Sequence, residues 1–360
     1  KISETDLRAL YVASQVVSWD FKDSTGAFYF GSACNYHKMH GILRLRQKQG
    51  WTDEEQRAAD EFIRILSEMR ERLMDLAEQA YAGKWKGIDI DPVIELNRKL
   101  DYTAWHFVEH NRLPGDQTLP DQAMENRIRA IPGWENAQIT ITPREWQDTE
   151  YYSGYNRATV EANGDSVDIV YSAYTGDIDS VTIAFTEESI DAEQTAGELV
   201  QKLFGPDFSV TMLPWHGQSP HRITFHYKGV EIARKGYDHP VMRVSYSYDK
   251  KDNKLLLEDI PPLATIAEAE LTPLLTEEQA REIVNETGDP VELLSLHHDL
   301  PRETGLVLLY SARSGRYVVA YQFNERGYVN AVTGEREASY SNYYVDFVAF
   351  PNTPVGHMNR

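Results

Sequence analysis

The feature that most constrains the fold is a pattern that the chain repeats: a capped helix, then β-rich sequence that closes on a strand and a tight turn. In the clearest copy the turn is Thr333-Gly334, and an earlier copy ends in the same way at Thr175-Gly176. In a middle copy Asp252-Asn253 stands at the corresponding place. Gly176 and Asn253 are 77 positions apart, and Asn253 and Gly334 are 81 apart. This near-constant spacing predicts one supersecondary unit repeated along the chain.

Each part of the pattern has a local physical reason. Thr276 can accept a hydrogen bond from the Gln279 backbone N–H while the Gln279 side chain reaches back, which is a capping box. Asp191 and Gln194 offer a similar arrangement at the start of the middle copy. Gly334 permits the positive φ that a tight turn needs, and Gly176 does the same in the first copy.

These residues resemble a known family. The run Val332-Thr333-Gly334-Glu335, preceded by Thr276-Glu277-Glu278-Gln279-Ala280, resembles a PepSY domain. Residues 196–208, followed by Tyr227-Lys228-Gly229-Val230-Glu231-Ile232, are similar to the repeated domain of the YcdB/YcdC proteins of spore-forming bacteria. The resemblance covers about 120–338. It implies cystatin-like α+β units, each a helix laid on an antiparallel sheet, in extracytoplasmic proteins that bind or restrain a protein partner, and it transfers no catalytic residues.

The first third of the chain has a helical pattern. Thr52 and Glu55 form a capping box, and a seam of apolar residues follows at steps of four and three. The seam consists of Phe62, Leu66, Met69, Leu73, Leu76 and Ala80, and Gly83 ends it. This predicts one long helix whose seam lies in the core of an intramolecular bundle, with a partner-binding coiled coil as the alternative. A similarity to the helical region of the spore germination protein YpeB, which also precedes PepSY units, favours the bundle.

The fold class predicted from these patterns is α+β, with an N-terminal helical domain followed by PepSY-like repeats. The helical domain is expected at 1–115. The repeats are expected at 116–187, 188–265 and 266–360, the third together with a C-terminal tail.

Composition excludes several kinds of partner. The formal net charge of −20 and a pI near 5.0 argue against binding to nucleic acid or to an anionic membrane surface, because both would be repelled. The chain has no run of eighteen or more apolar residues, so no membrane span is expected. Its single cysteine, Cys34, rules out an internal disulfide. The resemblance to PepSY proteins, and not the composition, implies a protein or a component of the cell envelope as the partner.

One sequence motif could carry metal chemistry. His106-Phe107-Val108-Glu109-His110 would place two histidines on one helix face, where they could bind Zn²⁺ with Glu109 as general base. The motif resembles the pitrilysin-type peptidases, and Glu187 or Glu188 would then supply the third ligand. The favoured interpretation is a solvated or capped helix end, because the sequence before Trp105 lacks the lead-in of that family and Glu187 does not fall in a predicted helix.

Two further clusters are candidate metal ligands. Cys34, His37 and His40 recur at steps of three and would share one helix face, but a structural site needs four ligands and no second pair follows. An ordinary helix surface is the favoured interpretation. The run 297–299 (His-His-Asp) is more typical of a polar loop, since adjacent histidines on a strand point to opposite faces.

The sequence therefore predicts a non-enzymatic extracytoplasmic binding or regulatory protein of a spore-forming bacterium. We expect no catalytic, cofactor-binding or metal-binding residues. The alternative is a zinc metallopeptidase that uses His106, Glu109 and His110.

Overall fold

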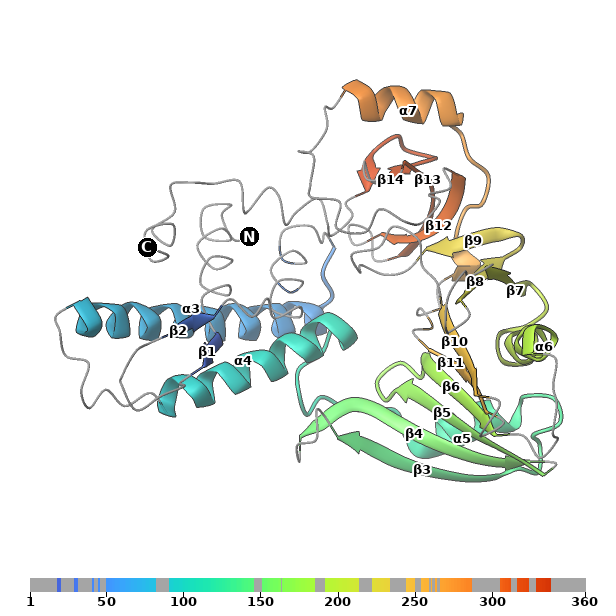
Figure 1. The fold of residues 1–360 in the computed structure, drawn as a ribbon, viewed down its shortest axis with the longest axis horizontal. Helices are drawn as coiled ribbons and strands as arrows, with labels where there is room; N and C mark the ends of the chain where they lie inside the picture. The colour runs from blue at the N-terminus through green and yellow to red at the C-terminus, as the bar shows by residue number, and fades with distance from the viewer. Residues whose placement is uncertain are drawn as a thin grey trace. The chain divides into compact units, whose positions relative to one another are not determined.

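The computed structural model describes a helical part and a larger sheet part (Figure 1). The described residues are 18–20, 29–31, 41, 45, 50–81, 91–145, 151–162, 164–184, 192–213, 222–233, 244–249, 254–258, 260, 263, 266–286, 305–311, 316–323 and 328–337. They divide into two compact units, one reaching to Asp116 and the other starting at Gln117. The predicted α+β class with an N-terminal helical part is confirmed.

The helical part is built on α3 (Asp53–Tyr81) and α4 (Asp91–His110). The predicted capping box starts α3: the Thr52 N–H donates to Glu55 Oε2 (3.0 Å), and the Glu55 N–H donates to Thr52 Oγ1 (3.2 Å). A short antiparallel ribbon of β1 (Ser18–Asp20) and β2 (Tyr29–Gly31) was not predicted, because the first third of the sequence was interpreted as helical throughout.

The seam of α3 lies in the core of this part. Phe62, Leu66 and Met69 are fully buried, and the ring centroid of Phe62 lies 5.3 Å from that of Phe107 in α4. The bundle interpretation is therefore confirmed for the first half of the seam. The second half, from Leu73 on, lies outside the described side chains. None of the helices in the described ranges is long and apolar enough to cross a membrane.

The described residues of the sheet part form three units, each a helix followed by antiparallel strands. The first unit contains α5 (Asp121–Arg129), β3 (Gln138–Glu145), β4 (Tyr152–Ala162), β5 (Asp165–Ser172) and β6 (Ile178–Ala184). The second contains α6 (Ala192–Phe204), β7 (Phe208–Leu213), β8 (Arg222–Tyr227), β9 (Val230–Ala233), β10 (Val244–Asp249) and β11 (Lys254–Leu257). The third contains η1 (Ile266–Glu268), α7 (Glu277–Glu286), β12 (Gly305–Ser311), β13 (Arg316–Gln322), β14 (Tyr328–Asn330) and β15 (Arg336–Glu337).

The three units share one strand order. Neighbouring strands pair as β3-β4-β5-β6 in the first, β7-β8-β10-β11 in the second and β12-β13-β14-β15 in the third. Strand β9 is an addition to the second unit, because it forms a hairpin with β8 beyond the end of β10.

The closing turns of the first and third units have the geometry that the sequence predicts. The Gly176 N–H donates to the Ser172 carbonyl (2.7 Å) in the first unit, and the Gly334 N–H donates to the Asn330 carbonyl (2.9 Å) in the third. The φ angles of the two glycines are 74° and 73°. In the second unit Asp249 of β10 pairs with Lys254 of β11, and the turn predicted at Asp252-Asn253 lies outside the described residues. The first and third units therefore share one turn geometry.

The closing turns of the first and third units also hold the starts of their helices. Leu119, just before α5, donates its N–H to the Ala173 carbonyl (2.7 Å), and Leu275, just before α7, donates to the Ala331 carbonyl (2.9 Å). The first backbone N–H groups of a helix have no partner within the helix. In the first and third units, the residue just before the helix is fixed by a hydrogen bond to the closing turn of the same unit.

The helix of the third unit is capped as predicted and covers its sheet (Figure 1). The Thr276 N–H donates to Gln279 Oε1 (2.8 Å), and the Gln279 N–H donates to Thr276 Oγ1 (3.2 Å). The equivalent prediction for the middle helix falls on Asp191, outside the described residues. The side chains that pack between α7 and the strands are Ala280, Val284, Phe323 and Val329.

The first and second units join through equivalent strands. Strand β6 pairs with β11 in antiparallel register, with Val181 opposite Leu257. Within their own units Val181 lies opposite Ile169 and Leu257 opposite Tyr246, and these two partners occupy the same place in β5 and β10. Equivalent residues therefore face each other, which is the relation of a two-fold axis.

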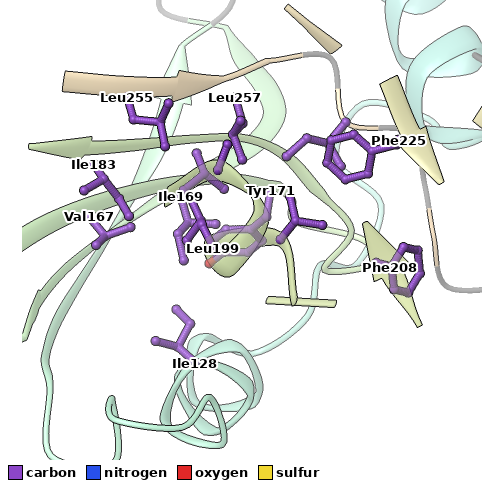
Figure 2. Close-up of a cluster of buried hydrophobic side chains, with 14 of the residues drawn as sticks. Ile128, Val167, Ile169, Tyr171, Ile183, Leu199, Phe208, Phe225, Leu255 and Leu257 are labelled. Atoms are coloured by element: carbon purple, nitrogen blue, oxygen red, sulfur yellow. The ribbon is translucent and has the colours of Figure 1, made fainter. Parts of the chain in front are cut away.

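The joined sheet has one core. Figure 2 shows Ile128 of α5 and Leu199 of α6 on the same side of the strands that carry Ile169 and Leu255. A two-fold axis perpendicular to a sheet keeps both helices on one face, so a single cluster of side chains serves both units. Its other members include Val160, Val167, Val181, Ile183, Val200, Phe208, Phe225 and Leu257.

Candidate functional site

The two histidines of the predicted metal motif lie in the last turns of α4. His106 is 0% exposed and His110 is 4% exposed, and their ring centroids are 5.5 Å apart. Tyr102 meets His106 edge-on, with its ring centroid at 4.8 Å. Of the two interpretations of this helix end, solvated or capped, the solvated one is wrong at both histidines, because both side chains are buried. Glu109, between them, is partly exposed.

A third ligand beside this pair is not found among the residues described. Within those ranges no three His, Cys, Asp or Glu side chains gather in a way that could hold a metal ion. Both sequence candidates for the third ligand, Glu187 and Glu188, lie outside the described residues. So do the cluster Cys34, His37 and His40 and the run 297–299. The hypotheses on these residues stay predictions.

A buried polar network in the third unit was missed by the sequence interpretation. Ser311 Oγ donates to Glu337 Oε2 (2.8 Å), and Asn330 Nδ2 donates to Glu337 Oε1 (3.2 Å). All three side chains are buried. Ser311 ends β12 and Glu337 ends β15, so these bonds tie together the two outer strands of the unit. Both carboxylate oxygens gain a donor, which offsets part of the cost of burying the group.

Asn330 links this network to the closing turn. Its Oδ1 accepts hydrogen bonds from the backbone N–H groups of Val332 (2.9 Å) and Thr333 (3.0 Å). The Asn330 side chain thus stabilises the turn through its Oδ1 and orients the Glu337 carboxylate through its Nδ2. The sequence held a signal for this role, since an asparagine directly before the turn commonly bonds its own backbone two residues on.

Tyr328 of the third unit is affected by the charge of Glu231 in the second unit. Tyr328 of β14 is buried, and burial, with the negative charge of Glu231, raises the pKa of its hydroxyl above the usual value of 10.0. Glu231 belongs to β9 and lies opposite Val307 of β12 in the parallel register. A charged residue of the second unit therefore lies beside the apolar cluster of the third that contains Tyr328, Val307 and Leu309.

His226 of β8 lies opposite Glu231 in the β8–β9 hairpin. Burial lowers the pKa of its imidazole from 6.5, and a backbone hydrogen bond to Thr224 partly opposes that shift. Its Nδ1 atom is enclosed and has no hydrogen-bond partner in the described part of the chain. A neutral imidazole is therefore favoured at this position, since its unprotonated nitrogen needs no acceptor.

None of the described helices of the first unit packs on the face of its sheet opposite α5; this helix-free face is a second candidate surface, and it is polar. On it Thr159 Oγ1 donates to Asp168 Oδ1 (2.6 Å) across β4 and β5, and Ser166 Oγ donates to Glu161 Oε1 (2.7 Å). Arg157 is exposed on the same face. The alternation of β4 and β5 puts Val160, Val167 and Ile169 on the helix side and leaves these polar residues on the other.

Comparison with known proteins gives one weak structural likeness. No family model matches the chain, and no curated protein matches it. Among solved structures, the Bacillus megaterium YpeB C-terminal domain aligns with 62% of this chain and 97% of that chain, at 14% identity and a TM-score of 0.30. YpeB was also the subject of the sequence resemblance, there for its helical region. At this TM-score the likeness carries no argument about function or site, and the resemblance to the YcdB/YcdC repeats stays a prediction.

Proposed function

We propose that this chain is a non-enzymatic, extracytoplasmic binding or regulatory protein that acts on a protein or a component of the cell envelope. In this proposal the chain consists of a helical domain (1–115) and PepSY-like repeats of the YcdB/YcdC type (116–187, 188–265 and 266–360). It has no catalytic, cofactor-binding or metal-binding residues, and it belongs to the envelope of a spore-forming bacterium.

The observation that carries the proposal is the helix-free face of the first unit. Its side chains are held in fixed positions by hydrogen bonds between neighbouring strands, as between Thr159 and Asp168. Polar groups ordered before contact lose little side-chain entropy when a partner arrives. Repeated units that share a continuous sheet also offer an extended surface, which suits recognition of a large partner.

The test is retention of the chain on two separate probes: purified cell-wall peptidoglycan and an immobilised envelope protein fraction from a spore-forming bacterium. We expect retention on one of them, and we expect Arg157→Glu to weaken it, because that substitution reverses an exposed charge on the proposed face. The matched control is Arg70→Glu, an exposed charge reversal on α3. Equal weakening of retention by both variants would show that the sheet face is not the binding surface. No retention on either probe would contradict the proposal.

A further inference from the structure

The β8–β9 hairpin connects the second unit to the third. It is short: His226 pairs with Glu231 and Tyr227 pairs with Val230. The turn between them is Lys228-Gly229, and both residues have positive φ (48° and 81°), as a two-residue hairpin turn of this kind requires. Two residue pairs are few, so the hairpin depends on its surroundings for stability.

Beyond the hairpin, β9 joins the sheet of the third unit. It runs parallel to β12, with Glu231, Ile232 and Ala233 opposite Val307, Leu308 and Leu309. In the described strand order this pairing is the step by which the sheet passes from the second unit to the third. Weakening the hairpin would therefore weaken the continuity of the sheet.

His226 lies opposite Glu231, the residue at which the β8–β9 hairpin continues into the pairing of β9 with β12. The groups opposite it are Glu231 on β9 and the neutral Ser209 on β7. Tyr328 of β14 lies near enough to Glu231 for the carboxylate to raise its pKa. At the tip of the hairpin Lys228 Nζ lies 3.7 Å from Asp207 Oδ2, and both side chains are largely exposed.

Protonation changes what the imidazole needs. A neutral ring carries one N–H, whereas an imidazolium carries an N–H on both nitrogens. The enclosed Nδ1, which has no hydrogen-bond partner in the described structure, would then become a donor that needs an acceptor. A buried donor left without a partner destabilises the segment that holds it. A hairpin of two residue pairs has little free energy with which to offset that destabilisation.

We propose that the β8–β9 hairpin is an acid-sensitive joint, in which protonation of His226 opens the hairpin and releases β9 from β12. The second and third units share a sheet at neutral pH and separate at this edge as the pH falls. The direction follows from linkage: a histidine whose pKa is lowered in the folded state favours folding above 6.5, and this contribution is lost as the pH falls below that value. This inference does not depend on which partner the protein binds.

Hydrogen exchange of the full chain at pH 7.5 and 5.0, corrected for the intrinsic rate, tests the proposal. We expect the amides of β9 and β12 to open about tenfold more often at the lower pH. His226→Gln keeps a polar side chain that does not titrate and should remove the difference. His110→Gln, which changes a buried histidine of α4, should leave it in place. An unchanged wild type, or the same acceleration in His226→Gln, would overturn the proposal.

A measurement on the wild type guards against a variant that fails to fold. Titration of the His226 imidazole by NMR should give a pKa below 6.5 in the folded chain. A value at or above 6.5 would contradict the proposal whatever the variants do.

Discussion

Replacing Gly334 with Val should destabilise the third unit by about 2–3 kcal/mol. The glycine has a φ of 73°, a conformation that costs a residue with a Cβ about 1–2 kcal/mol. A Cβ at this position would lie 3.3 Å from Ile283 Cδ1 and 3.4 Å from Leu275 Cδ1, so the two further methyl groups of Val must push against α7 and the segment before it. Such overpacking costs about 1–3 kcal/mol. The loss of Gly also lowers the conformational entropy of the unfolded chain, which offsets about 0.4–1 kcal/mol of this destabilisation.

Urea unfolding measures this difference. With a slope of about 2 kcal/mol per M, the midpoint should fall by about 1 M while the slope stays unchanged. The midpoint of Gly334→Ala should fall by less, because Ala has the same backbone cost as Val at this φ but adds little crowding. The control is Gly197→Ala in α6, where a Cβ meets Val210 Cγ2 at an ordinary 3.8 Å and the helix gains about 0.5–1 kcal/mol. A midpoint for Gly334→Val equal to that of the wild type would refute the role given to this turn.

Three further outcomes are expected. Thr276→Ala should cost about 1 kcal/mol in urea unfolding because it removes the cap of α7, and no loss would mean that the cap is redundant. A fragment of residues 117–337 should give a dispersed amide spectrum without the helical part, since its core is its own, and a collapsed spectrum would contradict the division at Asp116. After mild chelation the chain should hold well under one equivalent of zinc by elemental analysis, and His110→Ala should lower stability because the ring is buried, without changing metal content. Stoichiometric zinc lost in that variant would favour the peptidase.

The parts of the fold that the sequence predicts are those fixed by local chemistry. Thr52 with Glu55 and Thr276 with Gln279 form the two capping boxes as expected, and Gly176 and Gly334 take the positive φ that their turns need. These features depend on residues a few positions apart, so a sequence contains all the information that sets them.

Features set by distant pairing could not be predicted. Ser311 and Glu337 are 26 positions apart, and only the curvature of the third sheet brings them together. The pairing of β6 with β11 depends on how two units assemble, and the sequence around Val181 contains no local pattern that predicts this pairing. The burial of His106 and His110 was misjudged for the same reason, because what covers a helix end is decided by the rest of the bundle.

The facing of Val181 and Leu257 also bears on the history of the chain. A two-fold relation between equivalent residues is what a homodimer has, since both subunits offer the same patch to each other. Duplication and fusion of a gene for one unit would preserve that contact inside a single polypeptide. The interface then no longer has to match itself, so residues on either side of the axis are free to differ, as Leu256 and its equivalent Ser180 now do. The central strands of the sheet would in this account be a former subunit boundary.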